Sequence, residues 1–588
     1  MPTNFVSRHF LFNSVDMKRL LLFLVIFSVL PQIQAQIIEH NWTRTFPSGG
    51  GWSTFATGIS ITDIGYVYSI HSFGNQTWTG SSSNYFFSNG NTDFVIVKTS
   101  KTQNHMWTRH IGGIGHDRPS AIEQMANGDL IITGIFSDSV DFDPGLDTVW
   151  KVSQGQEDNF LLRLDKDGNF LNCVTFGGAG TSYINDLQIT ENDEIFICGW
   201  YTDSLNFSPL PQQNIHVCTE GYSSYLSKFD SNLNYISSVA FEGNVSITDL
   251  YRTSENTFLF AGYFEDTVYS HFNNSIDEKH SAGLRDAIYG EVDDQLNFIS
   301  QKTIGSDSDE LGWNIAQLAN GSVVLQLNFS DPFEIENGSD PIMVQGLYAS
   351  LSTGSAIVLA NTMILCLSGD TVLWHKRFSA SAYGRVYPQT AFLPDENGNL
   401  IASYYYHGFC NLGDNNFTLI EDGAQSGTFL LKIDQTGNIR WVRRINAFGS
   451  GIALIYALKL KGENLYAAGQ FSGSIDFDLS IAQDVQSGSA DPFITKWTLH
   501  DQYLSTDSDL MVSSPILYPN PTNETLFIKE SDIINLKIYD LSGREINPDY
   551  YFNGDHYQLN TTELRNGAYI LSYEKGNSLI AERFVVQH

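Results

Sequence analysis

Short apolar segments, each introduced by a turn, recur along most of this chain. The segment Asn127–Gly134 begins with an Asn-Gly turn, continues with Leu, Ile, Ile and Thr, and ends at a glycine. Apolar runs of this length between turn residues predict β-strands, because amphipathic helices need longer periodic segments. Related segments are Asp63–Tyr68, Asn192–Gly199, Asn256–Gly262, Asn320–Leu325, Asn397–Ala402 and Gly462–Gly469.

The spacing of these segments indicates a repeat, since Gly134, Gly199 and Gly262 are separated by 65 and 63 residues. Two more patterns follow the same spacing. One is an Asp-containing turn (Leu164–Asn169, Phe229–Asn232, Val292–Asp294, Ile433–Asn438), and the other is a strand that opens on Trp (Trp107–Arg109, Trp374–Arg377, Trp441–Arg443). We therefore expect four strands in each unit, named A to D in chain order. In the second unit they are Ala121–Gln124, Leu130–Phe136, Phe160–Leu164 and Leu171–Phe176.

Seven such units predict an all-β fold: a seven-bladed β-propeller of four-stranded blades over residues 40–506. One unit cannot bury both faces of its sheet, so units stack around a ring, and closing the ring removes exposed sheet edges. Trp42–Arg44 has the pattern of strand D with no strands A to C before it, whereas the seventh unit lacks a convincing strand D. We expect this N-terminal strand to complete the seventh unit. The alternative is that Gln502–Thr506 supplies the missing strand.

The repeats also resemble the SBBP-type β-propeller repeat of secreted bacterial proteins. The matching features are the Trp-x-Arg strand, Gly112 and Gly113 with Asp117, the Asn-Gly turn, Gly134 with Phe136, and Asp141–Gly145. The resemblance covers most of residues 40–500 and implies the propeller fold. It implies no particular chemistry, because function resides in sites rather than in folds.

The N-terminal segment has the parts of a signal peptide. Lys18 and Arg19 precede the apolar run Leu20–Leu30, and a small residue, Ala35, stands at the expected cleavage point. We assign residues 1–35 to an upstream extension and a signal peptide, Met17–Ala35. The apolar run is short for a membrane span, so no transmembrane segment is expected in the mature chain.

The C-terminal region departs from the repeat. A linker is expected at residues 507–513, and short strands between turns predict a small β-sandwich at residues 514–588. This region resembles the C-terminal sorting domain of the type IX secretion system, which implies export to the cell surface or the medium and an interaction with the secretion machinery. The motif residues are Tyr518, Pro519, Asn520, Pro521, Gly543 and Gly567.

Net charge and cysteine content limit the classes of partner and metal site that we expect. Lys and Arg total 32 against 65 Asp and Glu, which gives a formal net charge of −33. This field repels phosphate backbones and anionic membranes, so nucleic acid is not an expected partner, and it suits a soluble monomer or divalent cations. Five cysteines without a CxxC pair argue against a zinc site. Either one disulfide forms among Cys173, Cys198 and Cys218, or the thiols are free and buried.

Long connections mark the expected ligand-binding face. The A–B and C–D turns are tight, whereas the D–A and B–C connections are long and emerge on the same face of the ring. The competing interpretation is that these polar loops are solvated or cap neighbouring blades. The candidate ligand-binding residues on this face are His116, Asp117, Arg118, Tyr183, Asp309, Glu310 and Arg385.

Two recurring acidic patterns each allow a functional and a structural interpretation. Asp141–Gly145 and Asp476–Asp478 either hold calcium through carboxylate and carbonyl oxygens or form structural turns. No other cofactor is expected. Asp followed by Ser or Thr and an aliphatic residue resembles a bacterial O-glycosylation pattern, and it equally suits a turn before a strand. This pattern occurs at Asp138–Val140, Asp147–Val149, Asp203–Leu205, Asp266–Val268 and Asp370–Val372.

No catalytic motif is present: HExxH, the P-loop and GxSxG are all missing from the sequence. We therefore expect a non-enzymatic, secreted or cell-surface propeller that acts as a binding or adhesion module for an extracellular glycan or protein. The alternative is a secreted polysaccharide hydrolase or lyase with carboxylates at the channel mouth, because a glycosidase needs only two suitably separated acids. A scaffold without a ligand site is a third hypothesis.

Overall fold

The protein is built from β-strands throughout the part that the structure describes. The described residues form strands β1 to β46 and no helix, which confirms the all-β class. In the computed structural model these residues are 37–47, 55–79, 85–207, 215–272, 275–330, 333–335, 341–344, 348–350, 356–358, 361–380, 387–407, 410–414, 417–419, 426–479, 484–500, 517–518, 522, 524–528, 533–540, 545–546, 549–552, 557–565, 567–575 and 578–586. The predicted signal peptide and linker lie outside them.

The second unit shows how the sequence pattern becomes a sheet. Its strands pair antiparallel in the order β13-β12-β9-β8, joined by tight A–B and C–D turns. Gly128 in the A–B turn has φ +93°, a conformation that other residues rarely adopt. Strand β9 is buried along its whole length because both faces of the sheet pack against neighbours. The strands are β8 (Arg118–Gln124), β9 (Leu130–Phe136), β12 (Asp158–Leu164) and β13 (Phe170–Phe176).

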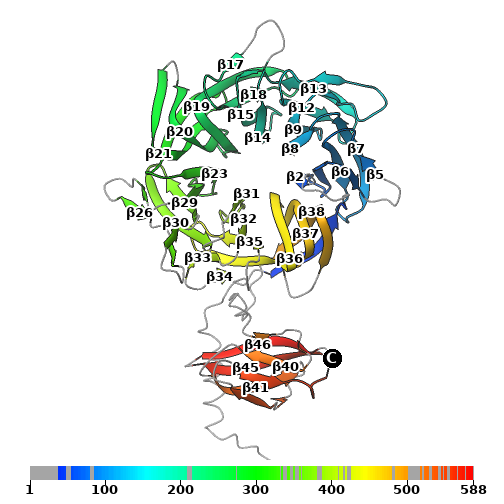
Figure 1. Ribbon diagram of the computed structural model, residues 1–588, viewed down its shortest axis with the longest axis vertical. Coiled ribbons are helices and arrows are strands. Elements are labelled where there is room, and N and C mark those ends of the chain that lie inside the picture. The colour runs from blue at the N-terminus through cyan, green and yellow to red at the C-terminus, as the bar shows by residue number, and fades with distance from the viewer. Residues whose placement is uncertain are drawn as a thin grey trace, which may run out of the picture.

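Equivalent four-stranded sheets follow one another around a ring, with strand A of each unit on the inside (Figure 1). β19 and β36 are long because each serves as strand D of one unit and then as strand A of the next. The inner strands are β2 (Phe55–Ile61), β8, β14 (Ser182–Ile189), the second part of β19 (Tyr235–Arg252), β23 (Glu310–Gln317), β31 (Tyr387–Pro394) and the second part of β36 (Ile439–Lys461).

The outer strands complete these sheets. Strands B are β3 (Val67–Phe73), β15 (Ile195–Tyr201), β20 (Phe258–Phe272), β24 (Val323–Phe329), β32 (Leu400–His407) and β37 (Asn464–Asp476). Strands C are β6 (Asp93–Thr99), β18 (Ser223–Phe229), β21 (Ser275–Val292), β29 (Asn361–Ser368), β35 (Ser426–Ile433) and β38 (Val485–His500). Strands D are β7 (His105–Gly113), β22 (Phe298–Ile304) and β30 (Thr371–Ala380), together with the first parts of β19 and β36.

The B–C connections differ from the expected ligand-binding loops, because they fold into β-hairpins that join neighbouring units. Val140 pairs with Gly113 of the preceding strand D, and Asn411 pairs with Ser379 in the same way. These two hairpins therefore extend the outer edge of the previous sheet. The hairpins of the B–C connections are β4 (Gln76–Trp78) with β5 (Tyr85–Phe87), β10 (Ser139–Asp141) with β11 (Trp150–Val152), β16 (Ser204–Asn206) with β17 (Ile215–Val217), β25 (Phe333–Ile335) with β26 (Ile342–Val344), β33 (Cys410–Asp414) with β34 (Phe417–Leu419), and the extensions of β20 with β21 and β37 with β38. A further short pair, β27 (Tyr348–Ser350) with β28 (Ala356–Val358), lies in the fifth B–C connection.

The N-terminal strand completes the last repeated unit, as predicted. β1 (Ile37–Thr45) pairs antiparallel with β38, so that Arg44 lies opposite Ile494. The Arg44 guanidinium also donates to the main-chain oxygen of Gln103, 2.7 Å away in the first unit. Arg109 donates in the same way to the Gly168 oxygen at 2.8 Å. At these two strands the Trp-x-Arg pattern thus links strand D to the next unit. Residues 502–506 lie outside the described part.

The core lies between neighbouring sheets. One cluster combines Ile70 and Phe94 of the first unit with Ile132 and Phe160 of the second, and the rings of Phe94 and Phe160 stack at 5.5 Å. Burial of these faces requires neighbours, as in other radial repeats. The cysteines are all free thiols, and four of them are buried, which resolves the disulfide alternative in favour of free thiols.

The C-terminal region forms two four-stranded sheets around a core of its own. The sheet orders are β39-β40-β44-β43 and β42-β41-β45-β46, and the core includes Leu526, Ile538, Tyr573 and Phe584. The strands are β39 (Leu517–Tyr518), β40 (Thr525–Ile528), β41 (Ile533–Asp540), β42 (Glu545–Ile546), β43 (Tyr550–Phe552), β44 (Tyr557–Asn560), β45 (Gly567–Lys575) and β46 (Ser578–Val586). Among the motif residues, Tyr518 pairs with Phe527 and Gly567 with Val586. Pro519, Asn520, Pro521 and Gly543 lie outside the described residues.

Candidate functional site

Each inner strand A contains a register irregularity at the same place. Such β-bulges bend the strand and redirect a side chain. The residues that interrupt the register are Thr57, Ser120, Asn185, Thr248, Trp313 and Tyr456, and strand β31 has a longer irregularity between Pro388 and Phe392. Thr57 donates to the Pro119 oxygen at 3.0 Å, and Asn185 donates to the Ile247 oxygen at 2.6 Å. The bulges therefore connect successive inner strands.

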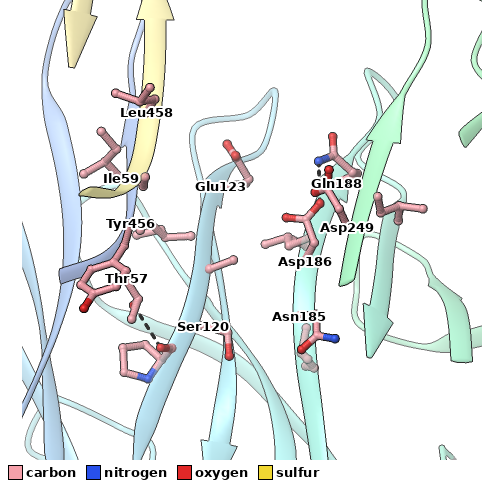
Figure 2. Close-up of a pocket in the computed structure, with 18 of the residues that line it drawn as sticks. Thr57, Ile59, Ser120, Glu123, Asn185, Asp186, Gln188, Asp249, Tyr456 and Leu458 are labelled. Carbon is pink, nitrogen blue, oxygen red and sulfur yellow. Dashed lines mark hydrogen bonds between the residues drawn. The ribbon is translucent and has the colours of Figure 1, made fainter. Parts of the chain in front are cut away.

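These strands enclose a cavity of about 730 Å³ at the centre of the ring (Figure 2). Its wall combines hydroxyl, amide and charged groups with aliphatic and aromatic side chains. The polar lining residues are Thr57, Arg118, Ser120, Glu123, Tyr183, Asn185, Asp186, Gln188, Thr248, Asp249, Tyr251, Tyr456, Lys459 and Gln470, and the apolar ones include Ile59, Ile122, Leu187, Ile315, Phe392 and Leu458.

Two carboxylates occupy one side of this cavity. Asp186 and Asp249 each follow the bulged residue of adjacent inner strands, and Figure 2 shows them grouped with Gln188. Burial raises the pKa of Asp186 to about 6. Burial and the neighbouring charge of Asp186 raise the pKa of Asp249 well above its usual range. Two acids in one poorly hydrated site disfavour each other's ionisation.

Hydrogen bonds fix both carboxylates. Asp186 accepts from the Gln188 side-chain amide at 3.0 Å, and Asp249 accepts from the main-chain N–H of Ile315 at 2.7 Å. Elsewhere in the lining, Glu123 of β8 forms an ion pair with Lys459 of β36. The charge of Lys459 also acts on Asp186, where it partly offsets the rise in the pKa that burial causes.

Two of the predicted ligand-binding residues, Arg118 and Tyr183, line the cavity. The Tyr183 hydroxyl donates to Glu157 at 2.6 Å, and its ring stacks on Trp200 with centroids 4.7 Å apart. The Arg118 Nε has no hydrogen-bond partner among the described residues. Both side chains are thus placed where a ligand in the cavity would meet them.

Two predicted acids are instead held by the scaffold. Asp117 is fully buried and accepts from the main-chain N–H of Gly113 at 2.7 Å. Glu310 is also fully buried and accepts from the Ser306 hydroxyl at 2.7 Å. Burial raises the pKa of each carboxyl to about 7. These acids stabilise D–A connections.

The other predicted residues lie in the same connections. His116 forms a parallel bridge with Thr92, and Asp309 forms one with Arg285, whose guanidinium also contacts the Asp309 carboxylate at 2.8 and 3.0 Å. These bridges join D–A connections to the ends of B–C connections. Arg385 lies outside the described residues. The structure thus gathers Arg118 and Tyr183 in one cavity and keeps Asp117, Asp309 and Glu310 in scaffold contacts.

The Asp-x-Asp turns have structural partners. Asp141 Oδ1 accepts from the N–H groups of Asp143 and Val149, at 3.1 and 2.8 Å, and Asp476 Oδ1 accepts from Asp478 and Asp484 at 3.1 and 2.9 Å. Among the described residues, no group of three or more His, Cys, Asp or Glu side chains is arranged to hold a metal ion. These contacts favour the structural-turn reading. Asp138, Asp203 and Asp266 of the Asp-Ser/Thr pattern have positive φ at the start of their hairpins, which is a backbone reason for Asp.

Sequence reasoning missed Asp186 and Asp249, and a signal for them existed. The two residues are 63 apart, the same spacing that separates Gly199 from Gly262. At the equivalent position the other units have small or amide side chains: Gly58, Ala121, Asn314 and Ala457. Aligning the strands A would have shown two acids where most copies have none.

Comparison with known proteins identifies the C-terminal region. Residues 516–587 match the family of secretion system C-terminal sorting domains. The protein is therefore exported through type IX secretion to the cell surface or extracellular space, and its sorting domain interacts with that secretion machinery. Within the described residues, no helix is long and apolar enough to cross a membrane.

Three of the solved structures that resemble the chain are distant from it in sequence. A protein of unknown function from Dyadobacter fermentans is 11% identical, with 80% of this chain and 100% of that chain covered and a TM-score of 0.33. A catalytically inactive virginiamycin B lyase from Staphylococcus aureus, bound to quinupristin, is 8% identical, with 78% and 99% covered and a TM-score of 0.31. The Neurospora crassa Pan2 WD40 domain is 9% identical, with 66% and 92% covered and a TM-score of 0.26. No curated protein matches the chain in sequence.

Proposed function

We propose that the protein is a secreted seven-bladed β-propeller, closed by β1 against β38, that binds an extracellular glycan in its central cavity. The cavity of about 730 Å³, lined by inner strands from around the ring, carries this proposal. Sites for small organic ligands range from about 300 to 1,000 Å³, so a short oligosaccharide fits this volume.

The chemistry of the wall supports a sugar ligand. Sugars present hydroxyl groups at their edges and C–H groups on their faces, so they need hydrogen-bonding and apolar contacts in the same site. Ser120 and Gln188 line the same cavity as apolar groups such as Ile59 and Leu458, and Figure 2 shows Gln188 on the side opposite Ile59 and Leu458. The net charge of −33 disfavours a polyanionic ligand, so a neutral glycan suits the site better.

A steric block tests the proposal. Ser120→Phe places a ring in the cavity, and we expect it to abolish binding of glycans that the wild-type chain retains on a glycan array. Thr148→Phe is the matched control, because Thr148 is exposed on the outer β10–β11 hairpin. Equal binding by both variants, or no glycan bound by the wild-type protein, would contradict a cavity site for glycans.

A second candidate function is polysaccharide hydrolysis, favoured by the two carboxylates of Asp186 and Asp249 on adjacent inner strands. A carboxyl with a raised pKa can serve as a general acid near neutral pH. Binding remains our first proposal because the Asp249 carboxylate is engaged by the N–H of Ile315 in the next unit. Release of reducing sugar by the wild-type chain, lost in Asp186→Asn and Asp249→Asn while both variants still bind the glycan, would favour the enzyme.

A further inference from the structure

We propose that a row of aromatic side chains, running from the cavity across the face where strands A begin, is a platform on which a neutral polysaccharide chain lies. This inference rests on the proposed glycan-binding function and extends the ligand from a short oligosaccharide to a polymer. The aromatic row consists of Tyr183, Trp200, Tyr222, Tyr263 and Trp313, all of them partly exposed.

The row is continuous over three units. Tyr183 lines the cavity and stacks on Trp200 at 4.7 Å, and Trp200 meets Tyr222 edge-on at 6.2 Å. The Tyr222 main-chain oxygen accepts from the N–H of Val245 at 3.3 Å, and Val245 pairs with Phe264, the residue after Tyr263. The Tyr263 ring of the fourth unit lies 6.0 Å from the Trp313 ring of the fifth unit. A ligand that leaves the cavity beside Tyr183 therefore meets further rings in succession.

The rings lie on or next to strands of the repeated units, and the equivalent positions of the second unit have other residue types. Trp200 and Tyr263 each follow the glycine that recurs in strand B of these units. In the second unit the residue after that glycine is Ile135. Tyr222 precedes strand C, where the second unit has Glu157. Rings fixed on strands lose little conformational freedom when they bind, which favours their use as stacking surfaces.

Polar groups at the row suit hydroxyl groups rather than a charged partner. The Arg285 guanidinium lies 5.7 Å from the centre of the Tyr263 ring and is neutralised by the two-point contact with Asp309. A polyanion would meet the net negative chain, whereas a neutral sugar chain would meet donors, acceptors and ring faces.

The test is the dependence of affinity on ligand length, measured by calorimetry on the full chain. The probes are cello- and manno-oligosaccharides of two to six sugars, with an oligogalacturonate of six sugars as the anionic comparison. Affinity should rise from the dimer to the hexamer and be lowest for the galacturonate. Trp200→Ala and Tyr263→Ala should each lower hexamer affinity about tenfold. Tyr263→Ala, whose ring is outside the cavity lining, should leave dimer affinity unchanged. Trp150→Ala is the control, because Trp150 is an exposed Trp on the outer hairpin, outside the row.

The outcomes separate this inference from the function on which it rests. Dimer and hexamer binding with equal affinity would overturn the platform while leaving a glycan site in the cavity. Absence of binding to every neutral sugar would overturn both, and tighter binding of the galacturonate would exclude a neutral ligand. The length series on the wild-type chain decides the matter even if a variant fails to fold. Unchanged hexamer affinity in both folded row variants would also overturn the platform.

Discussion

Two regions of this molecule contain buried acids, and they use them differently. On the face where strands C begin, Asp93, Asp158 and Asp286 recur in the first, second and fourth units, and each accepts from the N–H of the residue four positions earlier, at 2.9, 2.8 and 3.0 Å. In the cavity, Asp186 and Asp249 occur in only two of the described inner strands. An acid that recurs with the repeat supports the scaffold, whereas an acid that breaks the repeat is a candidate for function.

The recurring acids are also packed against glycines, which the cavity acids are not. A Cβ added to Gly112 would lie 2.0 Å from the Asp93 carboxyl carbon, and Gly177 and Gly305 stand in the same relation to Asp158 and Asp286. This close approach ends each strand D against the following turn. The repeated acid and the repeated glycine therefore form one close contact that recurs in these units.

The largest expected loss of stability comes from disrupting this contact between glycine and carboxylate. Gly177→Ala would place its Cβ 2.1 Å from Asp158 Oδ1, so either the buried carboxylate or the strand end must move. Overpacking of this kind costs about 3 kcal/mol, and we expect that loss in the free energy of unfolding measured by urea titration of the full chain. A variant as stable as the wild type would show that the close approach is dispensable.

Removing the Asp158 carboxylate should lower the free energy of unfolding less than the Gly177→Ala substitution does. Asp158→Ala removes the buried carboxylate that accepts from the Gln154 N–H at 2.8 Å, and we expect a loss of about 2 kcal/mol in the same titration. Asp158→Asn keeps an oxygen acceptor, so it should retain most of the stability. Equal losses in the two variants would mean that charge, rather than the hydrogen bond, is what the turn needs.

The repeat explains why much of the fold was predictable. Strand segments, four-stranded units and pairing of the N-terminal strand with the last unit all follow from the spacing of Trp42, Trp107 and Gly134 with their copies. The B–C hairpins were not predictable, since pairing such as Val140 with Gly113 depends on the neighbouring unit. The cavity acids were missed because the ligand-binding residues were predicted only on the long connections. The side chains of the inner strands meet only after the ring forms.

The cavity acids should behave in the opposite way to the recurring ones. Because the pKa of Asp186 is raised to about 6, the folded chain binds a proton more tightly than the unfolded chain. Its contribution to stability is therefore present in full below the unfolded pKa, near 4, and is lost as the pH rises through about 6.

Asp186→Asn is neutral at every pH, so its stability advantage over the wild type should fall by about 2 kcal/mol between pH 8 and pH 4.5. Thermal unfolding at both pH values measures this difference. If Asp186→Asn lowers stability at pH 8 as Asp158→Ala does, Asp186 belongs with the scaffold acids, and the distinction between the two regions fails.

The smallest expected effect concerns the acids of the Asp-x-Asp turns in the outer hairpins, which belong to neither the recurring set nor the cavity pair. Asp141 Oδ1 already accepts two main-chain N–H groups, and Asp476 Oδ1 does the same, so neither turn requires a cation to satisfy it. We expect the Tm of the full chain to differ by less than about 1 °C between EDTA and millimolar calcium. A rise of several degrees in calcium, abolished by Asp143→Ala, would instead make the hairpin turns cation sites and add a third role for acids to this repeat.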